Sequence, residues 1–152
     1  MKLTFICCSL VLFAACTKNK EADRQPGSTV RQMLLAGKWQ PSGLTGTASY
    51  MGKDSTLDLF YTVATCDRDD FIIFAENGTA SQDEGADKCP NDSQVEVATW
   101  LLLAGDTKLL IIDNNPDTMH LEISATEMKL GLTKANSQGT PVYFVHTYRN
   151  LN

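Results

Sequence analysis

The sequence predicts an all-β fold: a single antiparallel, up-and-down β-barrel of about eight strands, with a short helix at its start. Short apolar segments with period-two alternation recur between residues 57 and 148, and turn residues separate them at intervals of roughly eight to twelve residues. No intervening segment is long enough for a crossover helix, which disfavours parallel pairing. Closure into a barrel removes the edges that an open meander would expose. A two-sheet sandwich is the competing architecture.

Residues 1–15 have the pattern of a secretory signal peptide: one positive charge, an apolar run at residues 3–13, and two small alanines. The run is too short for a permanent transmembrane helix, which needs about 20 residues. Cys16 follows, and the stretch resembles the signal of bacterial lipoproteins, whose cysteine is acylated with fatty chains such as palmitate. We therefore expect lipidation at Cys16. A plain secreted protein with a small-residue cleavage site is the alternative.

Residues 16–31 are polar and without an apolar period for most of their length, which is typical of a flexible tether. Residues 28–36 favour a short helix, because Ser28 suits the N-cap and Gly37 follows the last apolar position. We expect the folded domain to cover residues 32–152.

Beyond the helix, the sequence predicts a series of short strands. One begins at Lys38, and Pro41 soon afterwards suits a strand end or an edge. The others are expected at residues 45–51, 57–63, 71–76, 79–83, 95–103, 109–111, 119–123, 128–132 and 142–148. Within residues 95–103, the alternation puts Val97 and Leu101 on one face and Trp100 on the other.

The segment from Cys66 to Cys89 predicts a β-hairpin clamped at its open end by a disulfide. Asn77-Gly78 lies at its middle and favours a type I′ turn, whose two central residues need positive φ. If the signal is removed and Cys16 is lipidated, the five cysteines reduce to this even pair in an oxidising compartment. Two free thiols are the alternative. A metal site is disfavoured, because neither cysteine has a second Cys or a His at ligand spacing.

The chain carries a formal net charge of −5, and 43% of its residues are hydrophobic. The charge argues against nucleic-acid binding, which needs clustered Lys and Arg. It also provides no basic membrane-binding face, so we expect contact with a membrane through the lipid anchor alone. We predict a monomeric cell-envelope protein, an outer-membrane lipoprotein on either the periplasmic or the surface face.

A glycine and a tryptophan follow the predicted helix, and an arginine follows the last predicted strand: Gly37, Trp39 and Arg149. The pattern resembles that of lipocalins, in which a Gly-x-Trp opens the first strand and an Arg near the end of the last strand covers that Trp. The resemblance implies that Trp39 and Arg149 form a barrel-closing pair. A cation–π contact of this kind contributes about 0.5–2 kcal/mol.

More closely, residues 32–150 resemble the lipocalin-like domains of Bacteroidota lipoproteins, which have a calycin-type β-barrel. The matching residues are Gly37-Lys38-Trp39, Cys66, Asp69-Asp70, Phe74, Asn77-Gly78, Gly85, Cys89, Trp100, Leu109 and Thr147-Tyr148-Arg149. The resemblance implies a small barrel, about eight-stranded, on a lipoprotein anchor. It brings no established activity.

A barrel of about eight strands is either filled by its own side chains or holds one small ligand. Apolar and aromatic residues at inward-facing positions are the possible ligand-lining residues. They are Tyr61, Phe74, Leu101, Met119, Met128, Leu130, Phe144 and Tyr148. A core packed by these same side chains is the alternative.

Acidic residues gather beside the first cysteine of the hairpin. Asp67, Asp69 and Asp70 offer oxygen ligands that suit Ca²⁺, but their spacing does not match an EF-hand loop. We interpret them as a solvated turn in which one Asp accepts hydrogen bonds from backbone amides. We expect the acidic residues within 83–87 to lie on the surface.

The sequence predicts no metal, no cofactor and no catalytic residue. His120 is expected to point outward and His146 inward, and no third ligand accompanies them. No Gly-x-Ser-x-Gly elbow, phosphate loop or His-Glu-x-x-His helix is present, so we predict a non-enzyme. The predicted function is binding of a small hydrophobic molecule in the barrel mouth. The alternative is a protein-interaction or enzyme-inhibitor module that acts through loops at residues 52–55, 85–93 and 114–118.

Overall fold

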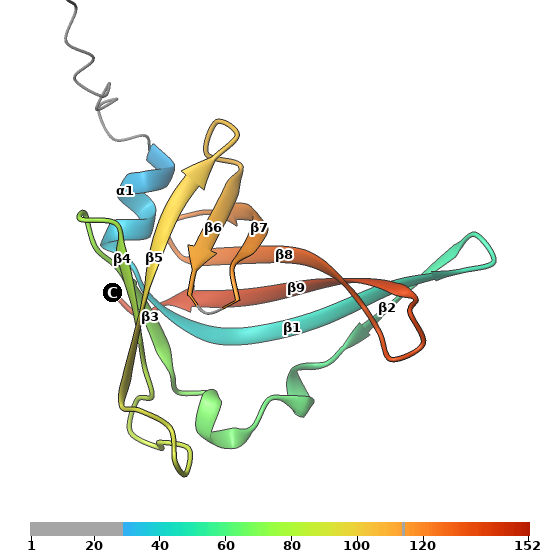
Figure 1. Ribbon diagram of the computed structural model, residues 1–152, viewed down its shortest axis with the longest axis horizontal. Coiled ribbons are helices and arrows are strands. Elements are labelled where there is room, and N and C mark those ends of the chain that lie inside the picture. The colour runs from blue at the N-terminus through green and yellow to red at the C-terminus, as the bar shows by residue number, and fades with distance from the viewer. Residues whose placement is uncertain (1–28, 114) are drawn as a thin grey trace, which may run out of the picture.

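The computed structural model describes residues 29–113 and 115–152, so the signal peptide, Cys16 and residues 16–28 of the predicted tether lie outside the described residues. The described part begins with one helix, α1, Thr29–Ala36 (Figure 1), so residues 29–31 of the predicted tether belong to the folded domain. The strands are β1 Lys38–Tyr50, β2 Lys53–Asp58, β3 Phe71–Phe74, β4 Thr79–Asp83, β5 Val95–Leu103, β6 Lys108–Ile112, β7 Asp117–Ile123, β8 Glu127–Ala135 and β9 Pro141–Asn150. Two 3-10 helices, η1 Phe60–Thr62 and η2 Thr65–Asp67, lie between β2 and β3.

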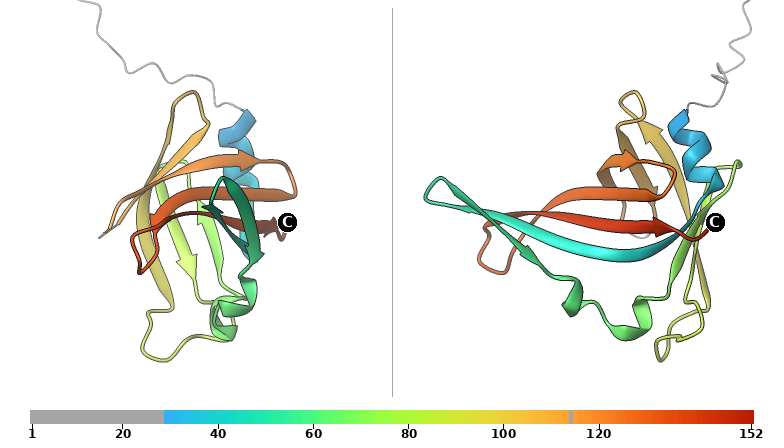
Figure 2. Two further views of the ribbon diagram at one scale, coloured as in Figure 1. Left: turned by 90° about the vertical axis from the view of Figure 1, so that its right-hand side faces the viewer. Right: turned by 180° about the vertical axis from the view of Figure 1, so that it is seen from behind.

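The strands form one antiparallel sheet that closes on itself. Its order is β2-β1-β3-β4-β5-β6-β7-β8-β9, and β1 also pairs with β9. All the strands except β2 therefore form an eight-stranded ring, which confirms the predicted up-and-down barrel and excludes the sandwich. The strand β2 pairs with the far half of β1, and this β1–β2 hairpin extends away from the ring (Figure 2). No helix in the described ranges is long and apolar enough to cross a membrane.

The helix α1 covers one end of the barrel. It contacts both β3 and β7, which lie on opposite sides of the ring. Trp39 is fully buried at this end, and its Nε1 donates a hydrogen bond of 3.1 Å to the Leu34 carbonyl oxygen of α1. A Cβ atom at Gly37 would lie 2.0 Å from the Trp39 ring, so only glycine leaves room for the indole beneath the helix. The Gly-x-Trp pattern thus has a packing reason.

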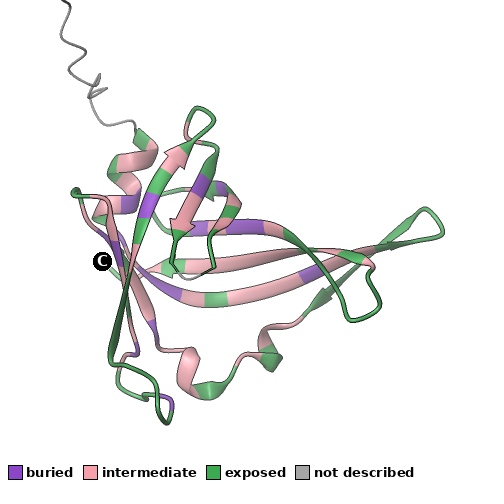
Figure 3. Cartoon of the chain, in the orientation of Figure 1, coloured by how far each residue is buried: buried purple, intermediate pink, exposed green. Residues whose placement is uncertain are grey.

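Large side chains fill the barrel close to α1. The buried core contains Leu34, Trp39, Phe74, Ala80, Trp100, Leu109, Leu121, Met128 and Leu130. The rings of Phe74 and Trp100 meet edge to face with centroids 5.4 Å apart. Buried positions gather in the ring of strands, whereas β2 is exposed along its length (Figure 3).

The predicted stacking of Arg149 on Trp39 is wrong. Arg149 lies opposite Gln40 in the β1–β9 register, and its Nε donates a 3.0 Å hydrogen bond to Gln40 Oε1. Because neighbouring residues of a strand point to opposite faces, Arg149 and Trp39 lie on different sides of the sheet. An arginine does cover an indole at this end, but it is Arg31 of α1, whose guanidinium carbon lies 4.7 Å from the Trp100 ring centroid.

Three strand predictions need correction. The strand expected to end near Pro41 and the one expected at residues 45–51 are a single strand, β1, and β2 begins at Lys53 within the loop expected at residues 52–55. Residues 57–63 do not form a strand: β2 ends at Asp58, whose Oδ1 accepts a hydrogen bond from the Phe60 amide and starts the turn into η1. Tyr61 is consequently 75% exposed. In β5 the faces are exchanged, because Trp100 is buried while Leu101 is 47% exposed. Residues 101–103 are all leucine, so the alternation of apolar and polar residues did not identify the inner face of β5. The largest side chain of the strand, Trp100, occupies that face.

The turn assigned to Asn77-Gly78 also differs in type. Gly78 has a positive φ of 84°, but the φ of Asn77 is not positive, which excludes type I′. Asn77 instead accepts a hydrogen bond from the Thr79 amide through its Oδ1. The turn at Met51-Gly52 has positive φ at both residues, as a type I′ turn requires.

The predicted disulfide is confirmed. Cys66 in η2 and Cys89 in the loop after β4 are bonded, with their Cα atoms 5.2 Å apart. The bond joins the η1–η2 segment to the open end of the β3–β4 hairpin. Closing a loop of this length in the unfolded chain stabilises the fold by about 3 kcal/mol in the chain-entropy account.

We predict that replacing both cysteines, Cys66→Ser with Cys89→Ser, lowers the free energy of unfolding by about 3 kcal/mol, because the unfolded chain regains the entropy of the open loop. Urea denaturation of the wild type and the double variant measures this. The wild type under reducing conditions should match the variant. A loss below about 1 kcal/mol would show that the bond constrains little.

Candidate functional site

A pocket opens where β1 separates from β3. These strands pair through only two residue pairs, Lys38 with Ile73 and Trp39 with Ile72. Beyond Trp39 the strands diverge, and the η1–η2 segment lies across the opening (Figure 1). The pocket has a volume of about 530 Å³ and lies away from α1, at the open end of the barrel.

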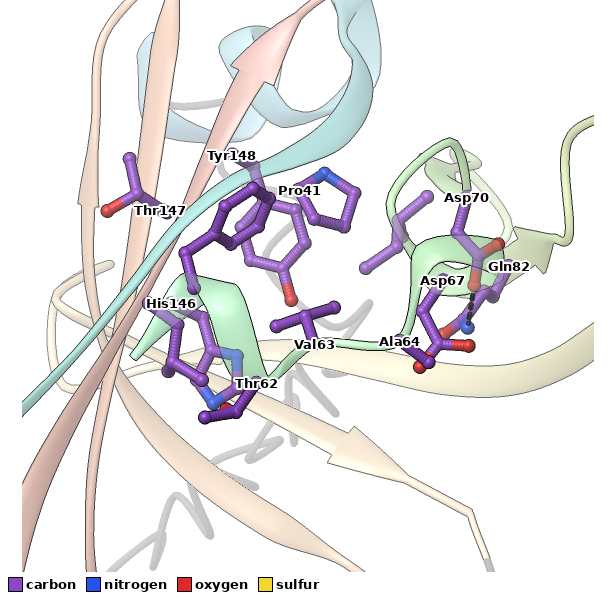
Figure 4. A pocket seen from close by; sticks show the side chains of 14 residues that line it. Pro41, Thr62, Val63, Ala64, Asp67, Asp70, Gln82, His146, Thr147 and Tyr148 are labelled. Carbon is purple, nitrogen blue, oxygen red and sulfur yellow. Dashed lines mark hydrogen bonds between the residues drawn. The ribbon is translucent and has the colours of Figure 1, made fainter. Parts of the chain in front are cut away.

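One wall of the pocket is mainly apolar and comes from β1, β3, β9 and the η1–η2 segment. Most of its residues are apolar: Pro41, Gly43, Leu44, Phe60, Val63, Ala64, Ile72 and Tyr148. Thr62, His146 and Thr147 complete this wall. In the β1–β9 register Pro41 lies opposite Tyr148 and Leu44 opposite His146, so these side chains share the inner face. Figure 4 shows Tyr148, His146 and Val63 converging on the cavity.

The two titratable groups of this wall are neutral near pH 7. Burial raises the pKa of Tyr148 to about 12. Burial, with a smaller contribution from the positive charge of Lys134, lowers the pKa of His146 below its usual 6.5. An uncharged wall of this kind accepts an apolar molecule, and its hydroxyl and imidazole groups can orient a polar substituent.

The opposite side of the pocket is acidic. Asp67, Asp70 and Gln82 line it, and Glu84 lies close by. Asp70 is 4% exposed and Glu84 6% exposed. Gln82 Nε2 donates a 2.9 Å hydrogen bond to Asp70 Oδ2 (Figure 4). Burial, followed by repulsion from Glu84, raises the pKa of Asp70 to about 6.

Asp69 has a structural role beside this acidic side. Its Oδ2 accepts hydrogen bonds from the backbone amides of Ala86 at 2.7 Å and Asp87 at 3.1 Å, and these bonds lower its pKa. A Cβ atom at Gly85, where φ is 66°, would lie 2.5 Å from the same oxygen. The interpretation that one Asp holds backbone amides is thus confirmed for Asp69. The solvated position expected for this turn is wrong for Asp70, which is buried. The expected surface position of Glu84 is wrong.

The structure separates the eight possible ligand-lining residues into four groups. Phe74, Met119, Met128 and Leu130 belong to the packed core or lie against it. Tyr61 and Leu101 are exposed, so their predicted lining role is wrong. Phe144 is half-buried, faces Leu132 and Gly46 in the register and does not reach the pocket. Tyr148 lines it.

Sequence reasoning missed most of the pocket, including Leu44, Val63 and Ile72. Their lining role depends on the point at which β1 leaves β3, and no local pattern marks that point. The predicted orientations of the two histidines agree with the structure, because His120 is exposed and His146 lines the pocket.

No family model matches the chain, and no curated protein matches its sequence. Among solved structures, the chain is similar to the crystal structure of bovine odorant binding protein complexed with its natural ligand. The identity is 10%, the TM-score is 0.42, and the match covers 79% of this chain and 73% of that chain. Similarity at this level says nothing about what this chain binds. The fold stated above rests on the strand pairings of the chain itself.

We predict that Asp70 destabilises the fold at neutral pH. Because its folded-state pKa of about 6 exceeds its ordinary value of 3.8, the folded protein holds the proton more tightly. The resulting stabilisation is complete below the ordinary pKa and is lost as the pH rises to about 6. Relative to Asp70→Asn, the wild type should lose on the order of 2 kcal/mol between about pH 4 and pH 7.

Urea denaturation of both proteins at the two pH values, in the presence of EDTA, measures this difference. Asp87→Asn, which removes an exposed carboxylate from the neighbouring loop, is the matched control and should follow the wild type. A constant difference between the wild type and Asp70→Asn at both pH values would contradict the prediction.

Proposed function

We propose that this protein binds a small hydrophobic molecule in the pocket at the open end of its barrel. The observation that carries the proposal is the cavity of about 530 Å³, which lies within the range of roughly 300–1,000 Å³ typical of ligand sites. Leu44, Val63 and Ile72 provide apolar contact for the body of the ligand. The Tyr148 hydroxyl and the His146 imidazole offer hydrogen bonds to one polar substituent.

A protein-interaction module is the second candidate, and the β1–β2 hairpin favours it. Tyr50 and Met51 at the hairpin tip are 75% and 86% exposed, and β2 forms an edge of the sheet. Exposed aromatic and methionine side chains are enriched at protein interfaces. The loop at residues 85–93 is exposed except at Gly85 and Cys89, but it carries no exposed aromatic or methionine side chain, and Asp69 and the disulfide hold it in place.

We also propose that the chain is an envelope lipoprotein anchored through Cys16, as the signal pattern of residues 1–15 indicates. The disulfide between Cys66 and Cys89 is consistent with an oxidising compartment outside the cytoplasm. Several further statements stay predictions. They are the relationship to lipocalin-like domains of Bacteroidota lipoproteins, the monomeric state, and the absence of enzymatic activity and of nucleic-acid binding.

We predict that the full-length chain, purified in detergent, binds the neutral apolar dye N-phenyl-1-naphthylamine. Val63→Trp should weaken binding by at least about tenfold, because the larger side chain occupies the cavity. Fluorescence titration measures the dissociation constants. Val97→Trp is the matched control, since Val97 is 67% exposed on the outer face of β5, and its affinity should equal that of the wild type.

Circular dichroism checks that both tryptophan variants fold. Equal affinity in Val63→Trp and the wild type, or no dye binding by the wild type, would contradict a pocket ligand, and the second result would favour the hairpin. Native mass spectrometry of protein extracted from its source, after exchange into a volatile buffer, should further reveal a co-purified lipid or metabolite.

We predict that Cys16→Ser abolishes incorporation of labelled palmitate when the full chain is expressed in a Gram-negative bacterium. Membrane fractionation should then find the variant released from the membrane fraction that holds the wild type. Cys7→Ser is the matched control, because Cys7 lies within the apolar run of the signal and is removed with it. Labelling that survives in Cys16→Ser would contradict the proposed anchor.

A further inference from the structure

Three carboxylates from separate parts of the chain meet beside the pocket. Asp67 belongs to η2, Asp70 directly precedes β3, and Glu84 directly follows β4. One oxygen from each side chain lies within 4.8 Å of the others. Figure 4 shows Asp67 and Asp70 on the same side of the cavity. Two of the three residues, Asp70 and Glu84, are more than nine-tenths buried.

No basic side chain in the described ranges forms an ion pair with this cluster. The ion pairs recorded there are Lys129 with Glu127 and Lys134 with Asp117, both elsewhere on the barrel. The nearest arginine in sequence, Arg68, donates hydrogen bonds to the Val63 and Tyr61 carbonyl oxygens instead. Carboxylates that are withdrawn from water without a counter-charge are unfavourable, so the cluster is suited to a bound cation.

The hydrogen bonds of Asp70 leave one oxygen unused. Gln82 Nε2 donates to Oδ2 and holds the carboxylate in place. Its other oxygen, Oδ1, is buried and has no hydrogen-bond partner among the described residues. Buried polar atoms nearly always have a partner, and an unmet oxygen on a carboxylate of this cluster is a ligand that a bound metal ion could take up.

We propose that Asp67, Asp70 and Glu84 bind a calcium ion. Calcium lies about 2.3–2.6 Å from its oxygen ligands, so it can join oxygens up to roughly 5 Å apart, whereas magnesium at about 2.0–2.1 Å reaches only about 4.2 Å. The three oxygens lie within 4.8 Å of one another, a spacing that calcium can span. Calcium also accepts irregular coordination by several carboxylates, whereas magnesium demands near-ideal octahedral geometry and usually keeps several waters. Water from the open pocket completes its coordination. The sulfurs of Cys66 and Cys89 lie near the cluster but are bonded to each other and do not act as ligands.

A calcium ion at this position would connect η2 to the β3–β4 hairpin, next to the disulfide that makes the same connection. It would thereby hold the η1–η2 segment across the pocket mouth. The site stands independently of the proposed hydrophobic ligand, because none of its three carboxylates belongs to the apolar wall.

Isothermal titration calorimetry with the full-length chain, purified with EDTA and then desalted, tests the site with calcium chloride alone. We expect one calcium ion per chain, with a dissociation constant on the order of 10⁻⁴ M or below. Asp70→Asn and Glu84→Gln should each weaken binding by at least about tenfold. Asp87→Asn, which removes an exposed acidic group from the same region, should bind as the wild type does.

Thermal unfolding provides a second measurement that does not require every variant to fold well. Calcium at about 1 mM should raise the melting temperature of the wild type and of Asp87→Asn, since binding to the folded state alone stabilises it. Magnesium at the same concentration should raise it less. No binding by the wild type, equal binding by Asp70→Asn and Glu84→Gln, or an equal effect of magnesium would overturn the proposal. None of these results bears on dye binding in the apolar pocket.

Discussion

The pairing of β1 with β9 is the constraint on which the rest of this structure depends. It joins the first strand of the ring to the last, from Trp39 opposite Asn150 to Ala48 opposite Val142. Without it the sheet would be an open meander with two exposed edges. With it the inner face of every ring strand is enclosed. Alternate side chains along each strand then point into the barrel or out to its surface. The register shift between Pro41 and Gly43 accommodates one extra residue of β1 within this seam.

One end of the barrel interior is packed and the other is open, because β1 pairs with β9 over most of its length but with β3 over only two residue pairs. On the β9 side β1 is paired along most of its length, but on the β3 side the pairing stops at Trp39. Close to α1, the large side chains of Trp39, Phe74 and Trp100 are buried and belong to the packed core. Beyond Trp39, the strands diverge and a cavity remains. A barrel of this size is either filled by its own side chains or holds one small ligand. In this protein the end near α1 is filled, and the other end contains the cavity.

The η1–η2 segment owes its position to a few specific contacts rather than to a sheet. The disulfide ties it to the loop after β4, and Asp69 holds the same loop through the amides of Ala86 and Asp87. These contacts bring Asp67 of the segment next to the buried carboxylates of Asp70 and Glu84. The segment therefore forms both the apolar lid of the pocket, through Val63, and its acidic side, through Asp67.

The sequence by itself determined the class of fold, the places of most strands and the disulfide. Alternation and turn residues are local properties, and Cys66 and Cys89 were the pair left by a simple count. Only the tertiary structure decided which face of β5 is buried, which arginine covers an indole, and where the pocket lies. Residues 101–103 are apolar on both faces, and Arg31 and Trp100 are distant in sequence. Leu44, Ile72 and Gln82 line one pocket only once the ring has closed. Such choices depend on packing between segments, which no local pattern contains.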